Sequence, residues 1–199
     1  MKTNSLFIGR FQPFHIGHLA DIKSIIAKGE HCIIAIAAAN KVGTWRNPLA
    51  GAERENIIKE TLKAESLLDP KGLPKGSYEV HQLIDIDDDD RWVQHVIDSL
   101  PPFSKIYSGS EYVRGFFVDD ERFETLPIKM IHDENDKILC ATSIRKEALK
   151  SENYKKYLHS STIGFLDELA FRERLVKILG KVGNLPCQKR MRSKQLNKT

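Results

Sequence analysis

SLFIGRFQPFHIGHLADIKSIIAK, residues 5–28, is the stretch that decides the fold of this chain. Its first five residues predict a short buried strand, and residues 16–28 predict a helix because their apolar side chains recur at helical spacing. A strand that runs directly into a helix is the first half of a βαβ unit, from which parallel sheets are built.

The same alternation continues to about residue 150. Further strands are predicted at residues 31–39, 78–84, 105–108 and 126–131, and further helices at 50–68, 91–100, 111–118, 143–150 and 163–179. This order predicts an α/β fold, a doubly wound parallel sheet with helices on both faces, followed by a C-terminal helical extension. Sheets of this kind bind ligands beyond the carboxyl ends of their strands.

Composition excludes several classes of protein. Hydrophobic residues make up 41% and charged residues 29% of the 199 residues, which is ordinary for a globular chain and excludes a disordered, collagen-like or coiled-coil protein. The longest apolar run, residues 32–39, is too short to cross a bilayer. The first residues do not have the pattern of a secretory signal, and the three cysteines form no CxxC pair. We therefore expect a cytoplasmic protein without a membrane partner.

The formal net charge of +4 is unevenly distributed along the chain. Residues 181–199 carry six basic residues and no acid, whereas residues 1–180 carry 25 basic and 27 acidic residues. We expect one domain over residues 1–180, with a core at 5–150 and a helical part at 151–180. Residues 181–199 are expected to form a disordered basic tail. A nucleic-acid partner would depend on that tail alone, and we do not expect one.

The loop after the first predicted strand carries the residue types of a phosphate site. His15 and His18 are three positions apart, so they share one face of the first helical turn. Free backbone N–H groups at that turn favour an anion, and Gly9 and Gly17 let a ligand approach the backbone. Arg10 adds a guanidinium suited to phosphate oxygens. A metal-binding HxxH pair is the alternative, but no third ligand stands at a suitable spacing.

A second group of residues, LCATSIR at 139–145, precedes another predicted helix. Thr142 or Ser143 is expected to cap that helix. Arg145 and Lys146 would then lie in its first turn, where positive charge opposes the helix dipole. A bound anion would turn this conflict into an attraction, but an exposed first turn that tolerates about 0.3–1 kcal/mol is an equally good interpretation.

These motifs resemble those of a known family. GRFQPFHIGH (9–18) is similar to the (H/T)xGH motif of the nucleotidyltransferase superfamily, and CATSIR (140–145) is similar to its second motif. The GRFQPFHxGH form is associated with archaeal-type nicotinamide mononucleotide adenylyltransferases. Further segments match in order and spacing, so the resemblance covers roughly residues 5–150. They are TWRNPLAGAER (44–54), DI (85–86) followed by WV (92–93), PPF (101–103) and YSG (107–109).

The resemblance implies a Rossmann-like fold and the transfer of AMP from ATP to nicotinamide mononucleotide, giving NAD and pyrophosphate by direct in-line attack. His15 and His18 would bind the ATP phosphates, and Arg10 and Arg145 would hold the β and γ phosphates. Further ATP contacts are implied for Gly9, Phe11, Thr142, Ser143 and Ile144, and contacts to the nicotinamide nucleotide for Asn47, Arg54 and Trp92. A core aromatic remains the alternative for Trp92, and an ordinary charged helix turn the alternative for Arg54.

The same resemblance implies Mg²⁺ as cofactor and a homo-oligomer. Two rival functions stay open: an adenylyltransferase with another acceptor (nicotinate mononucleotide, flavin mononucleotide or phosphopantetheine), and a non-catalytic nucleotide-binding regulator. The acidic run 87–90 is expected to be a solvated loop, with a metal role or selection against a negatively charged nicotinate ring as the alternatives.

Overall fold

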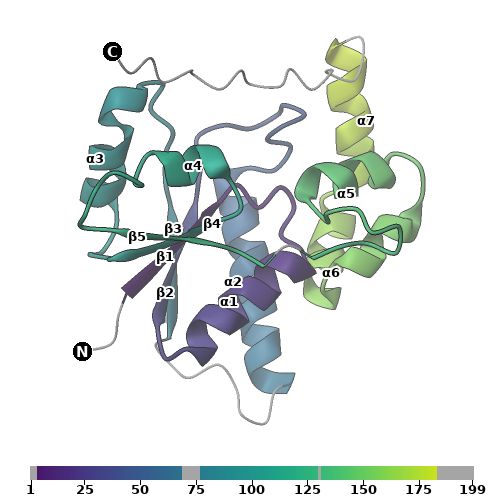
Figure 1. The fold of residues 1–199 in the computed structure, drawn as a ribbon. Coiled ribbons are helices and arrows are strands. Elements are labelled where there is room, and N and C mark those ends of the chain that lie inside the picture. The colour runs from purple at the N-terminus through teal and green to yellow at the C-terminus, as the bar shows by residue number, and fades with distance from the viewer. Residues whose placement is uncertain (1–3, 69–76, 130, 183–199) are drawn as a thin grey trace.

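A computed structural model describes residues 4–68, 77–129 and 131–182, and within them the backbone forms one parallel sheet (Figure 1). Its strands are β1 (Asn4–Gly9), β2 (His31–Ile36), β3 (Tyr78–Gln82), β4 (Lys105–Ser108) and β5 (Glu124–Pro127). They lie in the order β3-β2-β1-β4-β5, and every neighbouring pair is parallel. Strands β2 and β3 lie on one side of β1, and β4 and β5 lie on the other. The order of the strands therefore reverses at β1, and the switch point of the sheet lies at its carboxyl end.

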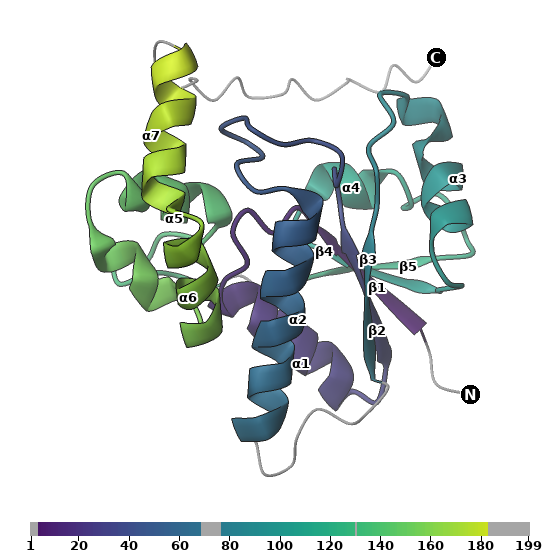
Figure 2. The same cartoon turned by 180° about the vertical axis from the view of Figure 1, so that it is seen from behind.

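Helices cover both faces of this sheet. Those of the first 150 residues are α1 (Ile16–Ala27), α2 (Gly51–Leu68), α3 (Asp89–Ser99), α4 (Glu111–Gly115) and α5 (Ala141–Ala148). The 3-10 helix η1 (Glu152–Tyr157), α6 (Ser160–Glu168) and α7 (Phe171–Val182) follow. Helices α1 and α2 lie on one face and α3 on the other, and α5 to α7 gather beside α1 and α2 (Figures 1 and 2). The predicted Rossmann-like fold is confirmed.

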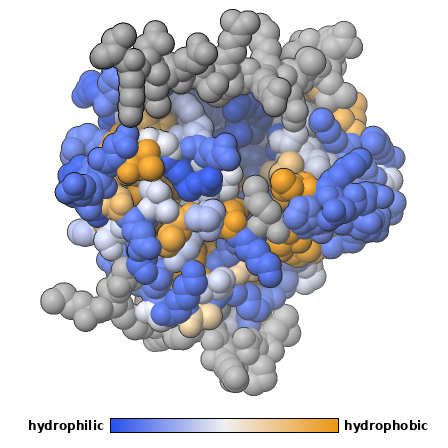
Figure 3. Space-filling model, viewed as in Figure 1, coloured by the Kyte–Doolittle hydropathy of each residue, from blue (hydrophilic) through white to orange (hydrophobic). Residues whose placement is uncertain are grey.

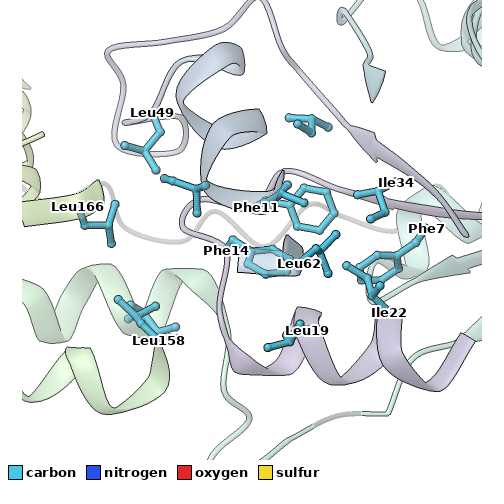
Figure 4. Packing of buried hydrophobic residues seen from close by; sticks show 14 of the residues in the cluster. Phe7, Phe11, Phe14, Leu19, Ile22, Ile34, Leu49, Leu62, Leu158 and Leu166 are labelled. Carbon is cyan, nitrogen blue, oxygen red and sulfur yellow. The ribbon is translucent and has the colours of Figure 1, made fainter. Parts of the chain in front are cut away.

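Alternating side chains of the strands explain why both faces are covered. Leu6 and Ile8 of β1 belong to one buried cluster with side chains of α3, whereas Phe7 belongs to a second cluster with side chains of α1 and α2. Full burial of such a side chain stabilises the fold by about 1.5–3 kcal/mol. In the close-up, the Phe11 and Phe14 rings of the loop after β1 reach this second cluster (Figure 4). The loop is therefore part of the core.

The C-terminal extension differs in detail from its prediction. The expected single helix over residues 163–179 is two helices, because Ala170 adopts a left-handed backbone conformation with φ of 47° and ends the first of them. Thr162 on α6 contacts Thr61 on α2 through a buried hydroxyl pair at 3.1 Å. The extension thus shares the core of residues 5–150.

Several predicted boundaries shift. The last strand is centred earlier than the predicted 126–131, and α5 begins two residues before the predicted 143. Strand β2 ends at Ile36 instead of residue 39, because Ala38 adopts a left-handed backbone conformation with φ of 51°, and Ala37 and Ala38 line the cavity. Residues 183–199 of the predicted tail lie outside the described residues, so the division into one domain and a tail stays a prediction.

Truncating a buried side chain of α6 tests whether the extension belongs to the core. Leu166 is fully buried, and we expect Leu166→Ala to reduce the free energy of unfolding by about 2–5 kcal/mol in urea denaturation. Val176 on α7 is 59% exposed, so Val176→Ala should change it by less than about 0.5 kcal/mol. Equal effects of the two variants would contradict a shared core.

Candidate active site

A cavity of about 710 Å³ lies at the carboxyl ends of the strands. The face of the molecule around it is mainly hydrophilic, with hydrophobic residues in separate patches (Figure 3). Nine of the twelve site residues predicted from the sequence line this cavity: Gly9, Arg10, Phe11, His15, His18, Asn47, Trp92, Thr142 and Arg145. Tertiary folding therefore brings together segments that are more than 130 positions apart in the chain.

Two stacked histidines begin helix α1. His15 is the N-cap residue, and its Nδ1 accepts a hydrogen bond from the backbone N–H of Gly17 at 3.2 Å. Nδ1 of His18 accepts from the backbone N–H of His15 at 3.3 Å, and the two ring centroids are 3.6 Å apart. Because both Nδ1 atoms are acceptors, the proton of each neutral ring is on Nε2.

The surroundings keep both rings uncharged. Burial lowers the pKa of His15 to about 3, and burial together with the adjacent His15 lowers the pKa of His18 well below its ordinary value. Nε2 of His15 is buried and has no hydrogen-bond partner among the described residues. A buried N–H without an acceptor is costly. The pair is therefore a set of neutral donors that an anionic oxygen would satisfy.

Arg145 supplies a buried cation beside the histidines. It is 3% exposed, donates to the backbone carbonyl of Gln12 and to Oγ1 of Thr142, and its guanidinium lies 5.2 Å from the centre of the Trp45 ring. Burial, and then the charge of Arg10, lowers the pKa of Arg145 to about 10, so the group still carries its charge at neutral pH. Its Nε lacks a partner among the described residues.

The start of α5 corrects the predicted cap. Cys140 is the N-cap residue, and Oγ of Ser143 accepts a hydrogen bond from the backbone N–H of Cys140 at 3.1 Å. Arg145 and Lys146 consequently lie in the last turn, where positive charge agrees with the helix dipole. The expected conflict with the dipole is absent because the helix starts earlier than its apolar pattern. Ser143 and the fully buried Ile144 do not line the cavity.

Arg54 is fully buried and also lies outside the cavity lining. Its guanidinium donates to the backbone carbonyls of Arg10, Ala37, Ala38 and Ala50 at 2.8–3.2 Å. Burial, and then the charge of Arg10, lowers the pKa of Arg54 to about 10. With its donors used in this way, Arg54 positions the loops at the ends of β1 and β2, which is neither of the two interpretations of this residue from the sequence.

The Trp92 indole packs as a core aromatic and also faces the cavity, so both interpretations of this residue from the sequence apply. The half-buried ring packs against Phe116 and Phe117, with centroids 4.9 and 5.9 Å away, and also lines the cavity. Asn47 lines the same cavity, and its Oδ1 is buried without a partner among the described residues. Trp92 offers an aromatic surface and Asn47 offers an unsatisfied hydrogen-bond acceptor, and both groups suit the binding of a ligand.

The acidic run is more ordered than the predicted solvated loop. Asp88 caps α3 by accepting a hydrogen bond from the backbone N–H of Arg91 at 3.2 Å, and Asp89 lies in its first turn. Asp87 pairs with Lys41 at 2.8 Å. Acids at a helix start are stabilised by the helix dipole, which explains part of the run.

Sequence reasoning missed several residues that line the cavity: Gln12, Asp21, Lys41, Arg46, Asp85, Ser108, Tyr112 and Lys129. A signal was present for two of them. Arg46 directly precedes Asn47 in the segment that resembles a family motif, and Asp21 is an acid on the apolar face of α1, three positions after His18. The others come from loops that only the tertiary structure brings to the cavity.

Together the fold and the cavity define an α/β protein with a cavity at the switch point of its sheet, where proteins of this architecture bind their ligands. Residues 6–163 match the model of the cytidylyltransferase-like family. The chain belongs to this family.

Similar proteins are named more specifically. A nicotinamide-nucleotide adenylyltransferase of Archaeoglobus fulgidus is 30% identical over 89% of this chain and 98% of the relative. Another with the same name, from Methanococcus aeolicus, is 31% identical over 87% of this chain and 94% of the relative.

Solved structures share the fold. A bifunctional NMN adenylyltransferase/ADP ribose pyrophosphatase of Francisella tularensis, complexed with AMP and a manganese ion, gives a TM-score of 0.66 at 21% identity over 92% of this chain. This chain spans about half (53%) of that protein. A nicotinic acid mononucleotide adenylyltransferase of Plasmodium falciparum, complexed with NaAD, gives 0.59 at 14% identity over 87% of this chain and 98% of the other. No helix in the described part of the chain is long and apolar enough to cross a membrane.

Gly17 offers a test of the histidine cap. A Cβ at this position would lie 2.9 Å from Cε1 and 3.0 Å from Nδ1 of His15, so the ring would have to move and its bond to the helix would weaken. We expect Gly17→Ala to fold but to lose phosphate-ligand affinity by about tenfold or more, measured by calorimetry with ATP.

Gly164 on α6 provides the matched control. A Cβ there meets nothing within 4 Å, so Gly164→Ala should leave ATP affinity unchanged and raise the free energy of unfolding by up to about 1 kcal/mol, because alanine favours the helix. Unchanged ATP affinity in Gly17→Ala would show that the position of the His15 ring is unimportant.

Proposed function

We propose that this protein is a nicotinamide-nucleotide adenylyltransferase, which transfers AMP from ATP to nicotinamide mononucleotide and releases pyrophosphate. The observation that carries the proposal is the pair of neutral histidine donors beside buried Arg145, at the switch point of the sheet. The same cavity continues to the Trp92 ring. The shared name of the relatives that match almost full length supports this activity.

The reaction needs positioning more than proton transfer. The 5′-phosphate of nicotinamide mononucleotide attacks the α-phosphorus of ATP, and the bond from that phosphorus to the bridging oxygen of the β-phosphate breaks. The attacking oxygen is already anionic, so no general base is required. Catalysis then depends on alignment and on donors that meet the charge of the transition state.

The chain offers suitable groups for each part of ATP. The Nε2–H groups of His15 and His18 would donate to the α-phosphate region, and Arg10 and Arg145 would hold the leaving pyrophosphate. Neutral imidazole donors suit this task, because they need no change of protonation between pH 5 and 8. Arg46, which also lines the cavity, would add a third positive charge near the phosphates.

Mg²⁺ is part of the proposal as a partner of ATP. The oxygens of the triphosphate are the hard ligands that Mg²⁺ prefers, and the bound ion would neutralise charge on the leaving group. The described residues contain no cluster of three or more acidic, histidine or cysteine ligands for a metal, so the phosphates would provide much of the coordination. A homo-oligomer and a cytoplasmic location also remain predictions.

The charge around Trp92 favours nicotinamide over nicotinate. Asp85, Asp87 and Asp89 line the cavity, and Lys41 pairs with Asp87 at 2.8 Å and with Asp85 at 3.7 Å. A nicotinate ring would add a carboxylate to this acidic environment, whereas the nicotinamide ring adds a neutral amide. The acidic run thus supports the nicotinamide mononucleotide as the preferred acceptor.

An acceptor assay tests the function. We expect chromatography of reactions with ATP and Mg²⁺ to show NAD when nicotinamide mononucleotide is the acceptor, and much slower turnover with nicotinate mononucleotide, flavin mononucleotide or phosphopantetheine. Asp87→Asn should narrow the difference between the nicotinamide and nicotinate substrates, because it removes one negative charge. Absence of pyrophosphate with every acceptor would refute the enzyme and favour a nucleotide-binding regulator.

His18→Ala tests the central donor. Removing one donor to the transition state costs about 10²–10³ in turnover in comparable sites, so kcat should fall by that factor while the melting temperature stays close to that of the wild type. Ser24→Ala, at an exposed position of the same helix, should retain full turnover. A folded His18→Ala enzyme with normal kcat would show that His18 takes no part in the reaction.

A further inference from the structure

Residues from both ends of the strand order line the cavity. Asp85 follows β3 at one end of that order, and Ile128 and Lys129 follow β5 at the other. The histidine and cationic groups of the loop after β1 come from the middle of the order. A reaction that joins two nucleotides through their phosphates needs a place for each base, and the Trp92 ring, which packs against Phe116 and Phe117, suits the nicotinamide ring.

Asp21 is a buried acid in the lining of this cavity, beside Lys129 in the loop after β5. It lies on α1 one turn after His18, is 7% exposed, and its carboxyl accepts a hydrogen bond from the backbone N–H of Lys129. Burial raises the pKa of Asp21 to about 7, so a large share of these carboxyls is protonated at neutral pH. In the part of the chain that the structure describes, no lysine or arginine forms an ion pair with it.

The position of this carboxyl has no evident role in stability. Burial of an acid without a cation is unfavourable, and an apolar residue on this face of α1 would pack as Ile22 and Ile25 do. A carboxyl also repels phosphate, so its place in a phosphate-binding cavity points to the part of the ligand that is uncharged. A residue that is costly to the fold and lines a ligand cavity is a candidate for recognition.

The surroundings of Asp21 fit a purine base. Ile128, Ile131 and Ile138 line the same region of the cavity and provide apolar surface for the flat faces of a ring. The exposed edge of adenine carries a 6-amino group, which needs a hydrogen-bond acceptor when it leaves water. In either protonation state, the Asp21 carboxyl presents an oxygen that can accept this bond.

We propose that Asp21 is a specificity-determining residue whose carboxyl oxygen accepts a hydrogen bond from the 6-amino group of the adenine of ATP. The proposal rests on the proposed function, since it takes ATP to be the nucleotide bound. It goes beyond that function by assigning base recognition to one residue of α1.

A cycle of two substitutions, one in the protein and one in the ligand, tests the contact. ATP and the triphosphate of purine riboside, which lacks the 6-amino group, are titrated by calorimetry into the wild-type protein and into Asp21→Leu. We expect the wild type to prefer ATP by about tenfold or more, which is the effect of a buried hydrogen bond. Asp21→Leu should lose this preference, mainly through weaker binding of ATP.

Two further variants separate recognition from structure. Asp21→Asn keeps an acceptor oxygen of the same size and should retain most of the preference for ATP. Ser24→Leu introduces the same side chain at an exposed position one turn further along α1, and should behave as the wild type does. Circular dichroism checks that each variant is folded.

The outcomes distinguish the contact from the proposed function. Equal loss of affinity for both triphosphates in Asp21→Leu, or no preference for ATP in the wild type, would overturn the role of Asp21. Because binding is measured without an acceptor, the result does not depend on which mononucleotide the enzyme uses. If the wild type binds ATP and forms no pyrophosphate, the proposed function fails while the contact to adenine stands.

Discussion

The guanidinium of Arg54 holds the site together. It joins the carbonyl oxygens at the ends of β1 and β2 to the start of α2, and so fixes the path of the chain where the sheet changes direction. A buried guanidinium is stable only when its donors are satisfied, so the four carbonyls and the charged group depend on one another. These bonds fix the backbone of the loop that carries His15 and His18, which suits the proposed reaction because that reaction depends on alignment.

The proposed phosphate site combines two kinds of hydrogen-bond donor, the charged guanidinium of Arg145 and the neutral imidazoles of His15 and His18. Arg145 retains its charge although it is buried, because the Gln12 carbonyl, the Thr142 hydroxyl and the Trp45 ring surround it. The histidines instead remain neutral and donate through Nε2, since their Nδ1 atoms cap the helix. In the proposed reaction, this division would supply charge for the leaving pyrophosphate and would keep uncharged donors near the attacked phosphorus.

Much of this architecture could be predicted from the sequence. Hydrophobic periodicity is a local property, so it indicated the strands and most helices, and the loop of His15 and His18 fell at the expected end of β1. The predicted ends of the helices were less accurate. The start of α5 was missed because Cys140 has no typical capping side chain, and the break at Ala170 was missed because the apolar pattern continues through it. The role of Arg54 was missed for a different reason: its partners are backbone carbonyls, and these have no signature in the sequence.

The sequence by itself determined the alternation of strands and helices, the placing of the histidine motif and the resemblance to a family of adenylyltransferases. Only the tertiary structure decided which side chains share the cavity, which histidine nitrogens carry protons, and that Ser143, Ile144 and Arg54 lie outside the lining. The physical reason is that periodicity and motifs act between near neighbours in the chain. Burial, tautomer and charge instead depend on groups such as Arg145 and Gln12, which are far apart until the sheet brings their loops together.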